Sequence, residues 1–223
     1  MSFFKMTFWV TIVVVLTGFF GTIYIYYNED KLNLHLMDSS NFKEEYESLN
    51  GRLIKGTNYT YNTITVPDNS NVIYSDYEEI IDIIKNKTGV IYLGYNTCMD
   101  CRNIVPVLLD AVNSYDIDYI YYLDPHNDAD TFSKVDGKLI RKSKASNNYY
   151  ALLDSLEEYV VYKDKYRFIE YPSVIFVKEG NILGIHTGTV ESHENKQYSL
   201  TINQSEELKN IYISYLDKMF KIE

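Results

Sequence analysis

The chain has 223 residues and a formal net charge of −10 at neutral pH. Hydrophobic residues make up 46% and aromatic residues 15% of it, which excludes a chain that is disordered over most of its length. A surface that follows nucleic-acid phosphates needs clustered Lys and Arg, so the acidic balance argues against nucleic acid as a partner. This length accommodates one domain with a sizeable core and room for an appendage.

A long uncharged segment lies close to the amino terminus. The 22 residues from Met6 to Tyr27 carry no charge, and a helix of about 20 apolar residues spans the hydrocarbon of a bilayer. Aromatic residues lie near both of its ends, as interface anchors do. Lys5 precedes the segment and Glu29 and Asp30 follow it, so the positive-inside bias places the amino terminus in the cytoplasm. The sequence therefore predicts a single-pass transmembrane helix over Met6–Tyr27, in the cell membrane, with the soluble part on the extracytoplasmic side.

Two other interpretations remain open for this segment. A cleaved signal peptide has an apolar core of only about 7–15 residues and a cleavage site of small residues, neither of which is found here. A buried core helix normally keeps a polar stripe, and this segment offers only threonines. The anchor and the signal peptide share the consequence that the soluble part lies outside the cytoplasm.

The anchor, with its cytoplasmic tip, takes up residues 1–27, and a stalk and N-terminal extension follow over residues 28–71. Apolar residues at helical spacing predict a short helix over residues 41–50. An alternating pattern of β-forming residues predicts a strand over residues 58–66, which Pro67 ends.

From residue 72 to residue 223 the pattern predicts one α/β domain. Apolar runs too short for helices indicate buried strands, and amphipathic segments indicate helices. In chain order the predicted elements are a strand at 72–74, a helix that opens at Ser75 and runs through Ile84, a strand at 89–95, a helix that follows Cys98, a strand at 117–123, a polar section at 124–146, a helix at 147–165, a hairpin of strands at 172–177 and 182–187, and a helix at 204–220.

The chain's two cysteines, Cys98 and Cys101, are three residues apart and directly follow a predicted buried strand. A helix amino terminus stabilises a thiolate, and this spacing places both sulfurs on one face of the first turn. Thiol–disulfide exchange needs an attacking thiolate and a second thiol that resolves the mixed disulfide. We expect Cys98 to be the exposed attacking thiol and Cys101 the buried resolving thiol. Asp100 should oppose thiolate formation, and Arg102 should counter that effect.

The cysteine pair and the acidic residues after residue 123 have other interpretations. A structural disulfide at this spacing closes so small a loop that it stabilises little. A zinc site needs two further ligands, and the four histidines show no paired spacing. Asp124, Asp128 and Asp130 resemble a calcium loop but lack its glycine and its distal glutamate, so a solvated loop is the better interpretation. The sequence predicts neither a metal nor a cofactor.

The unit of strand, Cys-x-x-Cys and helix, followed by a strand, a helix, a β-hairpin and a helix, resembles the thioredoxin fold. Pro106 lies where that family has a helix-bending proline, and Pro172 lies where it has a cis-proline that faces the cysteines. Gly180 and Gly188 have the spacing of the family's hairpin and strand-end glycines. The resemblance covers residues 72–223. It implies a central mixed sheet flanked by helices, with a helical insertion before the strand that begins at the cis-proline.

The same resemblance implies the site. Cys98 and Cys101 would form a redox-active disulfide, and Tyr171 and Pro172 would bind the substrate strand, since a proline without an N–H leaves neighbouring backbone groups free to pair. The chain is most similar to membrane-anchored thioredoxin-like proteins of Gram-positive bacteria, some of which are called bacteriocin transport accessory proteins. The segments that carry this narrower likeness are FKEEYESLNGR, TGVIYLGY and YPSVIFVKEGNILGIHTGTV.

The chain departs from the thioredoxin pattern at several positions. Thr97 replaces the tryptophan before the first cysteine, and Met99 and Asp100 replace the Gly-Pro between the two. Tyr92 takes the place of the family's buried acid, which puts general-base help for the second cysteine in doubt.

The expected function is that of a membrane-tethered extracytoplasmic thiol–disulfide oxidoreductase that acts on protein thiols and disulfides. The sequence does not distinguish oxidase, reductase and isomerase. A membrane electron-transfer protein is a candidate partner. The alternative is a non-enzymatic accessory module that assists the export or maturation of a secreted peptide such as a bacteriocin.

Overall fold

A computed structural model of the chain describes residues 34–115 and 117–220. The chain divides into two compact units, Met1–Asp38 and Ser39–Glu223, and each is described by itself. The described residues of the first unit, 34–38, are helical. The predicted transmembrane helix Met6–Tyr27 lies outside the described residues. Within the two described ranges, no helix has the length and apolar character needed to cross a bilayer.

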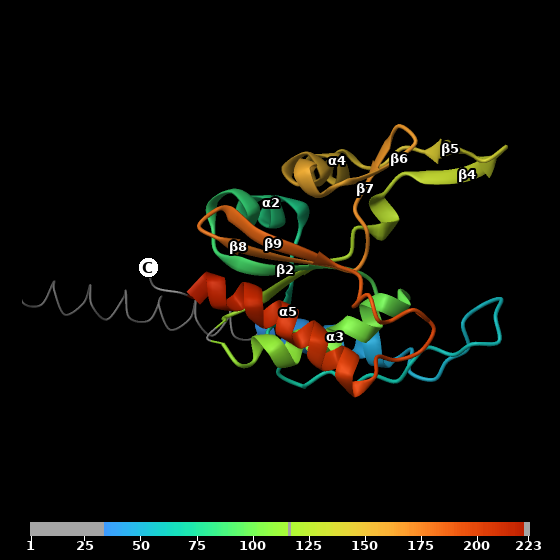
Figure 1. The fold of residues 1–223 in the computed structure, drawn as a ribbon. Coiled ribbons are helices and arrows are strands. Elements are labelled where there is room, and N and C mark those ends of the chain that lie inside the picture. The colour runs from blue at the N-terminus through green and yellow to red at the C-terminus, as the bar shows by residue number, and fades with distance from the viewer. Residues whose placement is uncertain (1–33, 116, 221–223) are drawn as a thin grey trace, which may run out of the picture. The chain divides into compact units, whose positions relative to one another are not determined.

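The second unit has a five-stranded mixed sheet at its centre (Figure 1). Its strands are β1 (Val72–Tyr74), β2 (Gly89–Leu93), β3 (Ile120–Leu123), β8 (Ser173–Lys178) and β9 (Asn181–Thr187). Their order across the sheet is β1-β3-β2-β8-β9. Strands β1 and β2 run parallel to β3, whereas β8 is antiparallel to β2 and β9 is antiparallel to β8. The mixed sheet expected from the resemblance is therefore present.

Helices cover both faces of this sheet (Figure 1). They are α2 (Tyr77–Asn86) and α4 (Asn147–Ser155) on one face, and α3 (Met99–Val112) and α5 (Ile202–Phe220) on the other. The alternation of a strand divides the core accordingly: Val90 and Tyr92 of β2 pack with α3 and α5, while Ile91 and Leu93 pack with α2 and α4. Two apolar layers therefore bury β2 completely, as its unbroken apolar run predicts.

The N-terminal extension contributes to the α3 side of the core. Residues 39–47 are helical, and Phe42 and Tyr46 are buried there against β2 and β3. The strand expected over residues 58–66 is wrong, because the described extension has a single isolated bridge, between Leu53 and Thr60. Side chains take up the backbone groups that a neighbouring strand would otherwise use. The Asn50 side chain accepts a hydrogen bond from the Ile64 N–H at 3.1 Å and donates one to its carbonyl at 2.9 Å.

The insertion between β3 and β8 is not the helical segment that the sequence led us to expect. It contains two short helical turns, η1 (His126–Asp128) and η2 (Glu157–Tyr159), the helix α4, and the hairpins β4 (Thr131–Val135) with β5 (Lys138–Ser143) and β6 (Val161–Lys163) with β7 (Tyr166–Phe168). The predicted helix over 147–165 ends at Ser155. Asp136 and Gly137 have φ values of 49° and 80°, the left-handed pair that a tight hairpin turn requires. Asp136 and Gly137 lie inside residues 124–146, for which the sequence predicts only a polar section.

Candidate redox site

The sheet topology brings the predicted site residues to one edge. Leu93 at the end of β2 pairs with Leu123 at the end of β3, and it also pairs with Ser173 at the start of β8. Cys98 follows β2 after a short loop, and Pro172 immediately precedes β8. The cysteine pair and the proline, which are far apart in the sequence, therefore belong to the same end of the sheet.

Cys98 and Cys101 are joined in a disulfide at the start of α3, with their Cα atoms 5.1 Å apart. Cys98 is the N-cap residue, and its Sγ accepts a hydrogen bond from the Cys101 N–H at 3.1 Å. Cys98 is partly exposed, whereas Cys101 is 0% exposed. The first cysteine is thus the more exposed of the two and the second is enclosed, which is the asymmetry that the predicted roles require. The roles themselves stay predictions.

The peptide bond between Tyr171 and Pro172 is cis, as expected. The Pro172 carbonyl accepts a hydrogen bond of 2.8 Å from the N–H of Gly188, a residue with a φ of 75° just after β9. The Tyr171 ring meets the ring of Tyr95 edge-on, with 5.7 Å between the centroids. The binding of substrate by these two residues stays a prediction.

Tyr92 occupies the position of the family's buried acid and is 1% exposed. Its hydroxyl lies 2.7 Å from the hydroxyl of Tyr46. Burial, reinforced by the neighbouring Tyr46, raises the pKa of Tyr92 well above its ordinary value. Tyr92 therefore keeps its proton at neutral pH and provides no general base for Cys101, which agrees with the doubt raised by the sequence.

Asp100, between the two cysteines, faces the loop that follows β9. Its Oδ2 lies 3.8 Å from the Nζ of Lys196, which also donates a hydrogen bond of 2.6 Å to the Oγ1 of Thr189. Desolvation raises the pKa of the Asp100 carboxyl, and Lys196 and His193 counteract only part of that effect. Among the described residues, its Oδ1 is buried without a hydrogen-bond partner. When it is ionised, this carboxylate disfavours a thiolate on the neighbouring cysteine.

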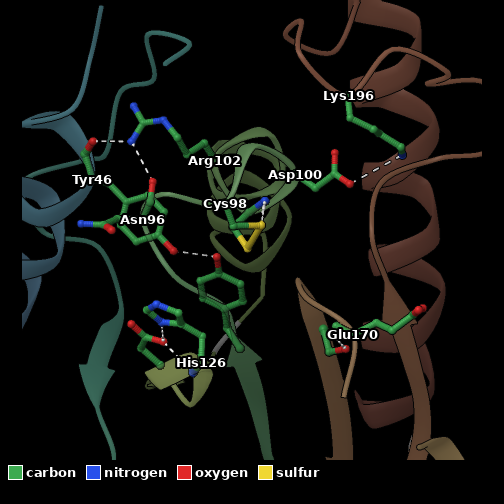
Figure 2. The surroundings of a disulfide bond; sticks show 12 residues. Tyr46, Asn96, Cys98, Asp100, Arg102, His126, Glu170 and Lys196 are labelled. Carbon is green, nitrogen blue, oxygen red and sulfur yellow. Dashed lines mark hydrogen bonds and ion pairs between the residues drawn. A yellow bond between two sulfur atoms is a disulfide. The ribbon is translucent and has the colours of Figure 1, made fainter. Parts of the chain in front are cut away.

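Arg102 is 0% exposed and turns away from the disulfide (Figure 2). Its Nη1 donates to the carbonyl oxygens of Tyr46 and Asn96, at 2.6 and 3.4 Å. The predicted counter-charge is thus fixed on the side of α3 that meets the N-terminal extension.

His126 lies in the surroundings of the disulfide and was not identified as a site residue from the sequence (Figure 2). The His126 Nδ1 is 2.7 Å from the Oδ1 of Asp124, and the imidazole stacks on the Tyr95 ring with 4.2 Å between centroids. The Tyr95 carbonyl accepts a hydrogen bond of 3.2 Å from the Cys98 N–H. The one local indication that Asp124 and His126 belong to the site is that they directly follow β3, which is parallel to β2.

The three aspartates considered as calcium ligands have separate partners. Asp124 bonds to His126, Asp128 accepts a hydrogen bond from the Tyr77 hydroxyl at 2.9 Å, and Asp130 accepts one from the Ala145 N–H at 2.7 Å. Across residues 34–115 and 117–220, no group of three or more His, Cys, Asp and Glu side chains is arranged to hold a metal.

No protein-family model matches the sequence, and no curated protein matches it. Among solved structures, thioredoxin O2 from Arabidopsis thaliana in its oxidised state is similar at 17% identity with a TM-score of 0.38, and the alignment covers 68% of this chain and 96% of that one. A similarity at this distance says nothing of what the present chain acts on.

The geometry of the chain itself indicates which chemistry this site can carry out. It has a mixed α/β fold, with a Cys-x-x-Cys disulfide at the first turn of the helix that follows β2 and a cis-proline at the same end of the sheet. A disulfide between a partly exposed cysteine at a helix N-terminus and a buried one is an arrangement that can undergo thiol–disulfide exchange.

Proposed function

We propose that the chain is a membrane-tethered, extracytoplasmic thiol–disulfide oxidoreductase that acts on proteins. The observation that carries the proposal is the asymmetric disulfide: a partly exposed Cys98 at a helix N-terminus and a fully buried Cys101. An exposed sulfur that can be attacked, next to a shielded one that resolves the intermediate, is what protein disulfide exchange requires.

In the reducing direction, the Cys98 thiolate attacks one sulfur of a client disulfide. The new bond joins Cys98 to the client, and the other client sulfur leaves as a thiolate, which takes a proton from solvent. Cys101, after losing its proton, attacks the Cys98 sulfur, so that the Cys98–Cys101 bond forms and the second client thiol is released. The pair loses two electrons and the client gains two. In the oxidising direction every step runs backwards, and the client thiolate attacks Cys98.

The tether supplies the location in this proposal. It is supported by the length, the lack of charge and the flanking residues of Met6–Tyr27. A domain held at the outer face of the membrane would meet newly exported chains and membrane-borne partners at a raised local concentration. A membrane electron-transfer protein at that surface is a partner of the class that would restore the redox state of the pair.

A non-enzymatic accessory module that assists the export of a secreted peptide is the competing function. The Tyr171–Pro172 edge would suit it, because a cis-proline beside a sheet end can bind an extended peptide without redox chemistry. Such a module would have no use for an accessible disulfide, and the exposure of Cys98 favours the oxidoreductase.

The test is insulin reduction in the presence of dithiothreitol, with the full-length chain in detergent. The wild type should accelerate precipitation of the insulin B chain, and Cys98→Ser should be inactive. Equal rates for the two would overturn the oxidoreductase and leave the accessory module. Equilibration of the pair with glutathione buffers then gives the direction: a potential of about −270 mV indicates a reductase and one of about −120 mV an oxidant.

A further inference from the structure

The Arg102 guanidinium is held by five hydrogen bonds, although its side chain is fully buried. The acceptors are the Tyr46 carbonyl at 2.6 Å, the Asn96 carbonyl at 3.4 Å, the Asn50 Oδ1 at 2.6 Å, and the Oδ1 and carbonyl of Asn62 at 3.2 and 2.8 Å. The Tyr61 ring lies 5.5 Å from the guanidinium carbon. Three of the five acceptors come from the N-terminal extension's residues 50–62, so the extension builds most of this enclosure.

All of these acceptors are neutral. Within the described residues, Arg102 forms no ion pair with a carboxylate. A buried charge is costly and is normally paired with an opposite charge. Burial lowers the pKa of Arg102, yet a guanidinium does not lose its proton in proteins. The enclosure therefore holds a permanent positive charge that lacks a counter-anion.

The position of this charge relates it to the disulfide. The Arg102 N–H donates to the Cys98 carbonyl at 3.0 Å, and the guanidinium reaches back to Asn96, two residues before Cys98. Figure 2 shows Arg102, Asn96 and Cys98 together around the start of α3. In the oxidised state the cysteine pair is uncharged. Reduction by a client dithiol adds two electrons and, when Cys98 becomes a thiolate and Cys101 a thiol, one proton. The anion that Arg102 lacks then appears one turn away.

We propose that Arg102 is a positioning residue whose buried, carboxylate-free charge stabilises the reduced, anionic form of the Cys98–Cys101 pair and so raises its reduction potential. This inference rests on the proposed function, and it assigns to the N-terminal extension the task of holding the charge in place. The extension is then part of the redox site as well as part of the core.

The other charges around the pair have partners of their own. They are Asp100 with Lys196, Asp124 with His126, Glu170 with Lys163, and Glu45 with the hydroxyl of Tyr122. In the lysine pairs the opposite charge partly cancels the field of the carboxylate, and in the other two a hydrogen bond holds the carboxylate in place. Among the described residues, Arg102 has no carboxylate within ion-pair distance, so its charge is not offset in this way.

The first test compares Arg102→Gln, which removes the charge, with Arg102→Lys, which keeps it. The readouts on the reduced full-length chain are the pH midpoint of Cys98 alkylation by iodoacetamide and the equilibrium with glutathione. We expect Arg102→Gln to move the midpoint up by about one pH unit and the equilibrium constant about tenfold toward the disulfide, or about 30 mV. Arg102→Lys should stay close to the wild type. Equal shifts in both variants would show that the hydrogen bonds matter and the charge does not.

The second test leaves Arg102 in place. Asn62→Asp gives the guanidinium the carboxylate that it lacks, and Asn62→Ala removes the same side-chain acceptor without adding charge. Asn62→Asp should raise the alkylation midpoint as Arg102→Gln does, whereas Asn62→Ala should leave it near the wild-type value. A midpoint that stays unchanged in Asn62→Asp would overturn the proposal even if Arg102→Gln fails to fold.

These readouts separate this inference from the proposed function. Alkylation and glutathione equilibria report on the sulfurs whether or not the chain turns over a protein substrate. A wild type that is inactive with insulin, yet shows the shifts above, would reject the oxidoreductase and keep the role of Arg102. A wild type that is active with insulin, but whose alkylation midpoint is the same in Arg102→Gln, would keep the oxidoreductase and reject the role of Arg102.

Discussion

One helical turn separates an accessible sulfur from an enclosed one. Cys98 ends the loop after β2 as the partly exposed N-cap residue, whereas Cys101, inside the first turn of α3, is fully buried. The same first turn carries Asp100 on its outer side and Arg102 on the side of the extension. Four side chains within five residues of the helix start thus differ in exposure and charge.

The two cysteines should behave differently when replaced singly. Cys101→Ser leaves the accessible Cys98 without its resolving thiol, so mixed disulfides with client proteins should accumulate. Cys98→Ser leaves only the buried sulfur of Cys101 and should trap none. The measurement is non-reducing electrophoresis after acid quenching of cells that express each variant. Equal amounts of trapped complexes would contradict the assignment of the roles.

Asp100 should make the stability of the fold depend on pH. Desolvation raises the pKa of its carboxyl in the folded state, so the ionised form disfavours folding once the pH exceeds the unfolded value. Stability from this group is fully present below the unfolded pKa and is lost as the pH rises through the folded pKa. Asp100→Asn should therefore raise the melting temperature of the oxidised chain at pH 7.

The effect of Asp100→Asn should vanish in acid, where wild-type Asp100 is neutral as well. Melting curves of both chains at pH 7 and pH 3 measure it. The loss of the contact with Lys196 acts in the opposite direction, and a lower melting temperature at pH 7 would show that this ion pair outweighs the desolvation.

At the scale of elements, the insertion forms a small assembly of its own. Phe132 of β4 packs on Tyr166 and Phe168 of β7, with ring centroids 4.7 and 5.2 Å apart. These contacts join two hairpins that share no ladder with the central sheet. Two-stranded hairpins are marginal alone, so the aromatic contact should decide whether they stay folded.

Phe132→Ala should loosen both hairpins and leave the central sheet unchanged. Aromatic pairs contribute about 1 kcal/mol beyond the area they bury, so amide exchange in β4–β7 should accelerate about fivefold. Hydrogen exchange with mass spectrometry measures this, with β2 and β8 as internal references. Val135→Ala is the matched control, because Val135 lies in the same strand and is 52% exposed. Equal acceleration in both variants would place the coupling of the hairpins elsewhere.

The elements with strong local patterns were predictable. The apolar run of β2, the helix after Cys98, the hairpin of β8 and β9 and the terminal helix α5 all form close to the expected positions. The hairpins of the insertion were missed, because their strands are mostly exposed and lack a clear alternation of apolar and polar residues. The segment over residues 58–66 has the β-forming residues of a strand but forms none, and the Ile64 backbone groups pair with the Asn50 side chain instead.

The site divides in the same way. Cys98 and Cys101 were identified from their spacing and position, and Pro172 from the resemblance to the thioredoxin family. The enclosure of Arg102 was not, since Asn50 and Asn62 lie 52 and 40 residues before it and no local pattern joins them. The dyad of Asp124 and His126 became significant only when the parallel pairing of β2 and β3 brought it beside the loop of Cys98. Tertiary contacts of this kind have no periodic signature in a sequence.

At the scale of the whole molecule, charge is distributed unevenly along the chain. Residues 1–27 contain one charged side chain, Lys5, and everything that follows is strongly acidic. An acidic domain is repelled by anionic lipid headgroups, so a tether is what would keep it at a membrane. The proposed anchor and the proposed site therefore depend on each other for access to exported clients.

The anchor should remain attached and should place the domain outside the cell. The 22 uncharged residues of Met6–Tyr27 match the thickness of a bilayer, and Lys5 on one side against Glu29 and Asp30 on the other sets the orientation. Expression of the full chain in a bacterium, followed by fractionation, should recover a full-length protein in the membrane fraction. Protease added to intact protoplasts should then digest the domain.

A shortened protein in the medium would show cleavage of a signal peptide, and protection from the external protease would show the opposite orientation. A variant with Lys5→Glu and both Glu29 and Asp30 changed to Lys serves as the control, because reversing the flanking charges should increase the protected fraction.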